Sequence, residues 1–585
     1  MDYLVVSRTA GPDAEQASAR LCEAAEAAGM TVRTLSPSTW LATSGPRRPK
    51  VLAVGSWLLV GDVFDRRRHF ASDEPVLEDA HLFERKMIRR FWGRYVGVRL
   101  GPDGDLVAVL RDPSGALECL TWSAGGLLFA ASDAPAWLVA AVRPDWRLAL
   151  DRIASALADP LNSWGACLID GPNLLTPGVL ADLTTGETTV LWQPDVFARW
   201  SEDGIIGDVD AETCLRDAVD EAVGGLARND GGLATEISGG LDSAIVAGSL
   251  ARVRPDVALW LNAYGIDPGS DERSYARAMA SLVGARLTEV PRAPEPLTEA
   301  MLLGLTVGVR PGFNALDTPN DRVWADHLQQ AGATTLMTGK GGDAVFIQGA
   351  GSDVFSDLWR ERGASAILSP ALPALARWNG RSVWSLVADA RAHDRRRARL
   401  GQRPSFITGL LVGEPDPTGN HPWLEAADDL GPAKRYQIAG VINGATFHGA
   451  SAQTAAADLV HPLLAQPVVE TCLVLSARQL TQGQRDRALA RAAFRDRLPR
   501  SIAERRSKGE LTAYYGRRLA RSLGVVRPWL LEGRLAAAGL VDRPKLDGLL
   551  REDSLIWRGG VGEIMIAAAM ESWVRTWEAR LAPRM

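Results

Sequence analysis

The sequence contains few of the residues that form disulfides or hold transition metals. Its five cysteines stand singly, are odd in number and form no CxxC pair, and its seven histidines show no HExxH spacing. Isolated cysteines of this kind suggest neither a disulfide framework nor a thiolate metal site. Dispersed histidines argue against a zinc enzyme. Catalysis by a metal bound to thiolates or imidazoles is therefore not expected.

The sequence also lacks an excess of positive charge and long apolar runs. It has 65 Lys+Arg against 70 Asp+Glu, a net charge of -5, whereas nucleic acids and anionic membrane surfaces attract a basic field. No stretch approaches the roughly 18 uninterrupted apolar residues of a membrane span. The first residues, MDYLVVSRTAG, carry no basic and apolar secretion signal. We expect a cytoplasmic protein that binds neither nucleic acid nor membrane.

The length and patterning predict more than one globular core. With 585 residues, of which 46% are hydrophobic, two or three cores are expected at roughly 100 to 200 residues per domain. Up to residue 205, short apolar runs alternate with Gly, Pro and Asp turn signals, and residues 178–183 and 187–192 form a hairpin-like pair. We therefore predict a β-rich, sandwich-like domain over residues 1–205.

The pattern changes at about residue 206 to longer amphipathic stretches. Residues 211–227 have helical spacing, and a strand-like run at 233–237 is followed by the string SGGLDS and an apolar helix. Further strand-like runs at 257–264 and 334–338 alternate with helices, which predicts a parallel sheet covered on both faces. Residues 206–585 are therefore predicted to form an α/β domain that becomes mostly helical after residue 355.

The strongest local signal is the loop between the first of these strands and its helix. It comprises Ser238, Gly239, Gly240, Leu241, Asp242 and Ser243. The glycines let the backbone approach an anion, the two serines supply hydroxyl groups, and a helix N-terminus favours negative charge. An aspartate in such a loop needs a cation between itself and the phosphates, which predicts Mg²⁺. The alternative is a turn that merely joins a strand to a helix.

A second glycine-rich loop weakens that alternative. The string TGKGGD follows the strand-like run at 334–338 and contains Gly339, Lys340, Gly341, Gly342 and Asp343. Loops at the carboxyl ends of parallel strands share one edge of a sheet, where open α/β sheets bind ligands. Asp242 and Asp343 are therefore predicted to meet at one Mg²⁺ ion.

These strings together resemble a known family of ligases. SGGxDS after a strand resembles the PP-loop of ATP pyrophosphatases, and SGGLDS, DERSYA and TGKGGD occur in the order found in asparagine synthetases and β-lactam synthetases. Residues 93–112 and 127–133 are similar to parts of the class II glutamine-amidotransferase domain of those enzymes, which has an αββα fold. The glutaminase of that family needs a cysteine directly after the initiator methionine, where this chain has Asp2. The resemblance thus implies an N-terminal domain that releases no ammonia from glutamine.

The C-terminal part resembles the lasso peptide cyclases within this family. The resemblance rests on HPLLAQPVVE at 461–470, GQRDRA at 483–488 and RRSKG at 505–509. It implies an enzyme that uses ATP to join a peptide's N-terminal amine to an Asp or Glu side chain of the same peptide. It also implies three partners: a ribosomal precursor peptide, a leader-recognition protein and a leader peptidase.

The resemblance assigns roles to some residues and leaves others open. Lys508 matches the lysine that lies beside the reacting carbonyl and the phosphates in asparagine and β-lactam synthetases; alternatively, it belongs to a basic surface turn with Arg505 and Arg506. Lys340 stands where β-lactam synthetases have a catalytic tyrosine and asparagine synthetases a glutamate, so neither role is transferred. His448 is a candidate general base because imidazole titrates near neutrality. The alternatives are that it is a satisfied interior histidine and that the amine loses its proton directly to water.

Two other functions remain open at this point. One is a small-molecule amide ligase, either an ammonia-dependent asparagine synthetase or a β-lactam synthetase-like enzyme. The other is a non-catalytic scaffold of the same fold. The presence of the SGGLDS loop, Asp343 and Lys508 argues against the scaffold, because a protein without catalysis has no need of two carboxylates beside a pyrophosphate loop.

Overall fold

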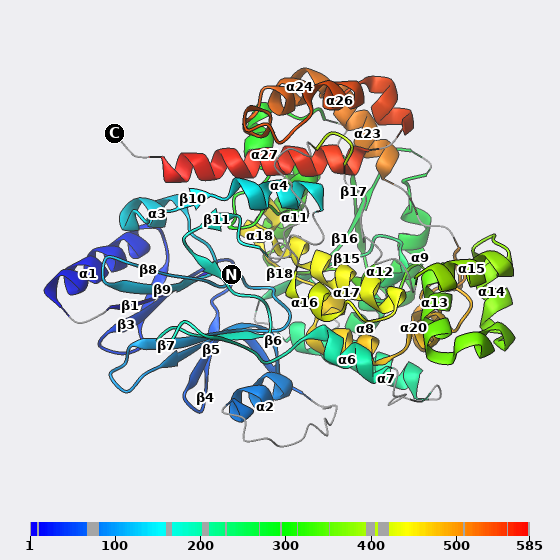
Figure 1. Cartoon of the computed structure of the whole chain (residues 1–585), viewed down its shortest axis with the longest axis horizontal. Coiled ribbons are helices and arrows are strands. Elements are labelled where there is room, and N and C mark those ends of the chain that lie inside the picture. Colours follow the sequence, from blue (N-terminus) through cyan, green and yellow to red (C-terminus); the bar gives the residue numbers. More distant parts are fainter. Residues whose placement is uncertain are drawn as a thin grey trace.

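The computed structural model shows a β-rich N-terminal part beside a parallel sheet with surrounding helices (Figure 1). It describes residues 2–8, 11–66, 81–159, 166–201, 207, 210–228, 231–254, 256–267, 269–292, 295–312, 314–349, 351–393, 404–407, 421–506, 509, 511–558 and 560–582. Among these residues, no helix is both long enough and apolar enough to cross a membrane.

Two six-stranded antiparallel sheets form the N-terminal part. The first contains, in spatial order, β12 (Asn173–Leu174), β8 (Leu120–Ala124), β9 (Leu127–Ala131), β1 (Asp2–Arg8), β3 (Thr39–Ser44) and β2 (Thr31–Thr34). The second contains β14 (Thr188–Val190), β13 (Val179–Asp182), β7 (Leu106–Arg111), β6 (Phe91–Leu100), β5 (Trp57–Asp65) and β4 (Lys50–Val54). A short pair, β10 (Arg147–Leu148) and β11 (Ile169–Asp170), stands apart from both.

Alternating side chains of β1 explain why the two sheets stack. Tyr3 and Val5 point into the core between the sheets, whereas Leu4 and Val6 pack into a second core under the helices. Successive side chains of a strand point to opposite faces, so a strand buried on both faces needs an unbroken apolar run. The sequence YLVV supplies that run, and the sandwich-like prediction for this part agrees with the stacked sheets. The resemblance to an amidotransferase domain and the boundary at residue 205 stay predictions.

Five parallel strands form the sheet of the second part, as the alternation of strands and helices predicted. Their spatial order is β17 (Leu287–Pro291), β16 (Leu259–Tyr264), β15 (Gly232–Glu236), β18 (Ala333–Met337) and β19 (Asp458–Val460). Side chains on one face join the core of α7 (Ala211–Leu226), α8 (Leu241–Val253) and α9 (Arg273–Val283). Those on the other face pack on α11 (Thr318–Gln330). The sheet is therefore covered on both sides.

Helices make up most of the remaining described chain. Those of the N-terminal part are α1 (Pro12–Ala27), α2 (Leu82–Arg90), α3 (Ala136–Val142), α4 (Leu150–Ala158) and α6 (Pro194–Trp200). Those after β17 are α10 (Glu299–Leu303), α12 (Gly342–Val345), α13 (Ser352–Arg362), α14 (Ala371–Trp378), α15 (Val383–His393), α16 (Pro422–Ala426), α17 (Pro432–Gly444), α18 (Ala452–Ala456), α19 (Gln466–Val474), α20 (Ala477–Thr481), α21 (Ala488–Ala493), α22 (Arg500–Ala503), α23 (Thr512–Arg521), α24 (Leu523–Leu531), α25 (Arg534–Ala537), α26 (Arg543–Leu549) and α27 (Val561–Leu581). The long helix α27 runs beside α3 and α4 of the N-terminal part (Figure 1).

A buried ion network joins the N-terminal sheets to the edge of the parallel sheet. Asp62 on β5 accepts hydrogen bonds from Arg47 at 2.8 Å and from Arg94 at 2.6 Å. Arg47 also binds Asp458 on β19 at 2.9 Å, and Arg94 donates to the carbonyl of Leu459 at 3.0 Å. Burial alone would raise the pKa of Asp62, but the attraction of Arg94 and Arg47 outweighs it and holds this pKa below its usual value.

Replacing Asp62 with asparagine is expected to lower the free energy of unfolding by about 3 kcal/mol, because it leaves two guanidinium groups partly unpaired in the interior. The carboxylate pKa of an unfolded chain is about 4 and that of folded Asp62 is lower, so its contribution is present above about pH 4 and is lost on acidification through the folded pKa.

Thermal unfolding of the wild-type protein and of Asp62→Asn across a pH series tests this prediction. The difference between their free energies of unfolding should become smaller below about pH 4. Asp65→Asn, on the same strand but in an exposed pair with Arg90, is the matched control and should change little. Equal stability of Asp62→Asn and wild type at pH 7 would contradict the role of the network.

Candidate active site

The SGGLDS loop leaves β15 and turns back on itself before α8 begins. The Ser243 hydroxyl accepts the backbone N–H of Ser238 at 3.1 Å and lies 2.9 Å from the Ser238 hydroxyl. Gly239 has φ +92°, and a Cβ there would lie 2.8 Å from the carbonyl oxygen of Glu272. This conformation therefore requires glycine. The result is a tight loop at the N-terminus of a 13-residue helix, which favours an anion.

The TGKGGD loop leaves the neighbouring strand β18 and touches the first loop directly. A Cβ on Gly339 would lie 2.3 Å from the backbone nitrogen of Ser243, and one on Gly342 would lie 2.5 Å from the carboxyl carbon of Asp242. The Thr338 hydroxyl lies 2.8 Å from Nδ1 of His461. Gly339 and Gly342 are thus needed because the first loop approaches so closely.

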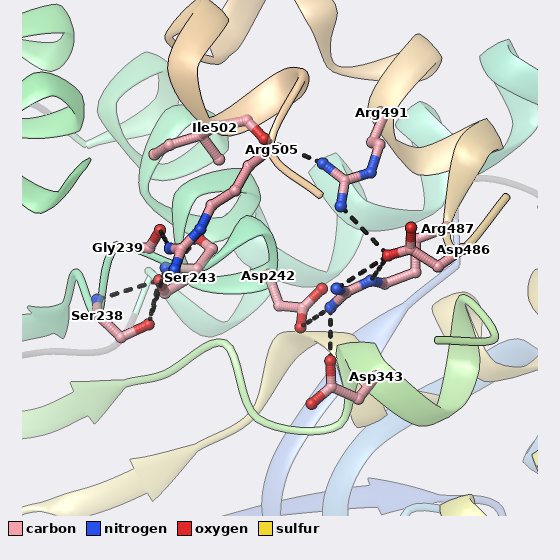
Figure 2. A network of polar contacts seen from close by, with 11 residues as sticks. Ser238, Gly239, Asp242, Ser243, Asp343, Asp486, Arg487, Arg491, Ile502 and Arg505 are labelled. Carbon is pink, nitrogen blue, oxygen red and sulfur yellow. Dashed lines mark hydrogen bonds and ion pairs between the residues drawn. The ribbon is translucent and has the colours of Figure 1, made fainter. Parts of the chain in front are cut away.

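The two predicted metal ligands converge, and an arginine lies between them (Figure 2). Nη1 of Arg487 is 3.0 Å from Oδ2 of Asp242 and 2.5 Å from Oδ1 of Asp343. Oxygen ligands of this kind suit Mg²⁺, which usually takes one or two carboxylates and completes its shell with phosphate oxygens. Within the described residues, no group of three or more Asp, Glu, His or Cys side chains could hold a metal by itself. The arrangement therefore fits a magnesium ion that arrives with nucleotide phosphates.

Arg487 belongs to a chain of ion pairs that sequence reasoning did not single out. Its Nε donates to Oδ2 of Asp486 at 3.1 Å, and the same oxygen accepts from Arg491 at 3.2 Å. Arg491 in turn donates to the carbonyls of Ile502 and Ala503. The string GQRDRA, which contains Arg487, had contributed to the family resemblance, so the sequence did mark this position as a candidate. The ionic partners of Arg487 were not deducible from it.

Arg505 and Gly509, which flank Lys508 in the sequence, lie beside the SGGLDS loop. Lys508 itself lies outside the described residues, but Oε1 of Glu272 accepts from Arg505 at 2.5 Å and from the backbone N–H of Gly509 at 2.7 Å. Arg505 also donates to the carbonyl of Gly239 at 3.2 Å, and its guanidinium stacks 4.0 Å from the Tyr275 ring. Arg505 is only 10% exposed. The basic string is therefore docked against the loop at this arginine.

A cavity of about 680 Å³ opens beside the second loop. Its charged wall includes Lys340, Glu236 and Arg292. The Lys340 ammonium lies 5.1 Å from the centre of the Phe447 ring. Burial lowers the pKa of Lys340 and raises that of Glu236, while the attraction between the two opposes both shifts. Apolar side chains complete the wall, among them Trp324, Phe406, Tyr515 and Ile566.

His448 lines a different cavity, of about 500 Å³, together with Asp2 and Arg94. Burial, followed by the charges of Arg94 and Lys340, lowers the pKa of His448 to about 3. Its ring lies 4.7 Å from that of His461. An imidazole whose pKa lies this far below neutrality is a weak proton acceptor at pH 7. His448 and Lys340 therefore line different cavities, and the general-base role considered for His448 stays a prediction.

Comparison with known proteins agrees with this geometry. No curated protein matches the chain. The model of the family described as asparagine synthase matches residues 214–575. The matched range contains the parallel sheet, both glycine-rich loops, and the carboxylates Asp242 and Asp343 that meet at Arg487. The chain therefore belongs to the asparagine synthase family, whose members are ATP-dependent ligases that form amide bonds.

Proposed function

We propose that the protein is a lasso peptide cyclase, which closes a ring between the N-terminal amine and an Asp or Glu side chain of a precursor peptide. The observation that carries the proposal is the cavity of about 680 Å³ beside the second loop. Ligand cavities of about 300 to 1,000 Å³ enclose drug-sized molecules. The volume and the aromatic wall suit part of a folded peptide better than a single free amino acid.

The proposed reaction has two steps. In the first, an oxygen of the peptide carboxylate attacks the α-phosphorus of ATP, the bond to pyrophosphate breaks, and an acyl-adenylate forms. In the second, the peptide amine attacks the carbonyl carbon, the bond to AMP breaks, and the amine loses a proton. Activation is needed because an oxide is a poor leaving group, whereas AMP leaves readily.

The loop residues would bind the phosphates during the first step. Ser238, Ser243 and the N-terminus of α8 would bind the pyrophosphate, which is supported by the contact between the two hydroxyl groups at the start of this helix. Asp242 and Asp343 would hold Mg²⁺, whose charge would offset that of the phosphate oxygens. Lys508 would add a cation beside the developing pyrophosphate and the tetrahedral carbon, as the family resemblance implies.

The cavity would position the reacting peptide groups. Arg292 and Lys340 are cations that can attract the substrate carboxylate, and Glu236 can attract the amine. Holding the two ends together contributes to the rate by proximity, and the apolar wall keeps water from the adenylate.

The proposal also assigns roles to the two predicted domains and names the source of the nitrogen and the partners. Residues 1–205 would form a degenerate amidotransferase domain, and residues 206–585 the synthetase domain. The nitrogen nucleophile would be the N-terminal amine of the peptide itself. The working partners would be the precursor peptide, a leader-recognition protein and a leader peptidase, all in the cytoplasm.

The test is intact-mass analysis of a precursor peptide encoded beside this gene, incubated with the protein, the processing partners and Mg-ATP. We expect the mass of one water to be lost, with AMP and pyrophosphate formed, and neither result with Asp242→Ala. AMP formation with free aspartate and ammonia, but without mass loss, would instead establish a small-molecule ligase. No AMP under either condition would support the scaffold.

A further inference from the structure

We propose that Arg487 is a built-in counter-cation, which keeps Asp242 and Asp343 from binding free Mg²⁺ and yields its place only when nucleotide phosphates enter the loop. The proposal rests on the proposed function only in taking these two aspartates as metal ligands. It requires no peptide substrate. It makes the metal site conditional on nucleotide.

The position of the guanidinium is the first support. One nitrogen, Nη1 of Arg487, lies 3.0 Å from Oδ2 of Asp242 and 2.5 Å from Oδ1 of Asp343 (Figure 2). A divalent ion that bridges the same two oxygens would have to occupy the space of this nitrogen. Arg487 and a bridging metal therefore compete for one place.

The surroundings hold Arg487 in this place. Its side chain is only 6% exposed, and Nε and Nη2 both contact Asp486 at 3.1 Å. Asp486 is itself fixed by Arg491, which donates to two carbonyl groups of the chain. The backbone of Arg487 has φ +48°, a left-handed conformation that is uncommon for residues other than glycine. These contacts and this backbone conformation indicate that the Arg487 side chain is held in one position and does not move freely at the surface.

The charges explain why nucleotide would release it. Arg487 already places one positive charge between Asp242 and Asp343. A divalent cation added beside it would be repelled by the guanidinium. Phosphate groups remove this obstacle, because they supply oxygen ligands for the metal and a new anionic partner for the guanidinium. Within the described residues, no third carboxylate can take the place of those phosphates.

The consequence is an order of binding. Without nucleotide, Arg487 attracts both carboxylates and offsets the repulsion between them, so they stay close together. With nucleotide, metal and phosphates enter together and the guanidinium moves to the phosphates. The wild-type protein should therefore bind a divalent ion weakly until an ATP analogue is present.

Mn²⁺ binding followed by electron paramagnetic resonance tests this inference directly. We expect wild type to bind Mn²⁺ tightly only with a non-hydrolysable ATP analogue. Arg487→Gln should bind Mn²⁺ without the analogue about tenfold or more tightly than wild type, because the competing charge is gone. Its unfolding temperature should fall without metal and recover with Mn²⁺. Arg487→Lys should keep the wild-type behaviour, and Arg500→Gln, in an exposed pair with Glu504, is the matched control.

Tight Mn²⁺ binding by wild type without nucleotide would overturn the inference, and this measurement stands even if Arg487→Gln fails to fold. An unchanged Mn²⁺ affinity in a folded Arg487→Gln protein would overturn it equally. Adding Asp242→Asn to Arg487→Gln should remove the new site; if it does not, the metal lies elsewhere and the inference fails. None of these measurements depends on ligase activity. A failure of this inference can therefore be distinguished from a failure of the cyclase proposal.

Discussion

Replacing Asp242 with asparagine is expected to lower the rate of AMP formation by about a thousandfold, the usual size of effect when a group that stabilises transition-state charge is removed. Asparagine has the shape of aspartate but lacks its charge. It therefore weakens the metal site and leaves phosphate charge unbalanced during attack on the α-phosphorus. The measurement is the rate of AMP and pyrophosphate release with substrate present.

The fold should survive this substitution, which separates a chemical effect from a structural one. Arg487 would still pair with Asp343 and Asp486, so the unfolding temperature should change by only a few degrees. Asp256→Asn is the matched control, because Asp256 lies in an exposed pair with Arg254. A rate near that of wild type for Asp242→Asn would remove this residue from the site. A rate loss accompanied by unfolding would make its role structural.

The two glycine-rich loops were predictable from sequence because the glycines that they require can be read in the strings SGGLDS and TGKGGD. Position 239 requires glycine because its φ is positive, and position 339 requires it because another backbone segment lies close by. The meeting of Asp242 and Asp343 followed from a general property of parallel sheets, whose loops gather at one edge. The parallel sheet itself was predicted from alternating strands and helices.

What could not be predicted depends on distant parts of the chain. Arg487 meets Asp242 across 245 residues of sequence, a pairing that no local pattern encodes. The strand β19 is three residues long and joins the sheet from far along the chain, so periodicity could not reveal it. The lowered pKa of His448 depends on burial among residues of both parts, whereas the sequence indicated only that an imidazole was present.

Removing the carboxylate of Glu272 is expected to lower the rate of AMP formation by about a hundredfold, because small displacements of catalytic groups can cost that much. Glu272 touches no predicted substrate group. It accepts the hydrogen bonds of Arg505 and of the Gly509 backbone, on either side of Lys508 in the sequence, and so holds these two residues beside the SGGLDS loop. We therefore expect Glu272→Ala to lower kcat while leaving the KM for ATP nearly unchanged.

A double-mutant cycle with Lys508 distinguishes positioning from a separate role. If Glu272 acts by placing the segment of Lys508, then Glu272→Ala should slow Lys508→Ala little further, since residues that act as a unit are not additive. Glu272→Gln keeps an acceptor for the Gly509 N–H but loses the charge that pairs with Arg505, so its rate should lie between those of wild type and Glu272→Ala. Effects that multiply in the double variant would show that Glu272 acts independently of Lys508. Glu289→Ala, which removes an exposed pair with Arg277, provides the control for loss of a nearby carboxylate.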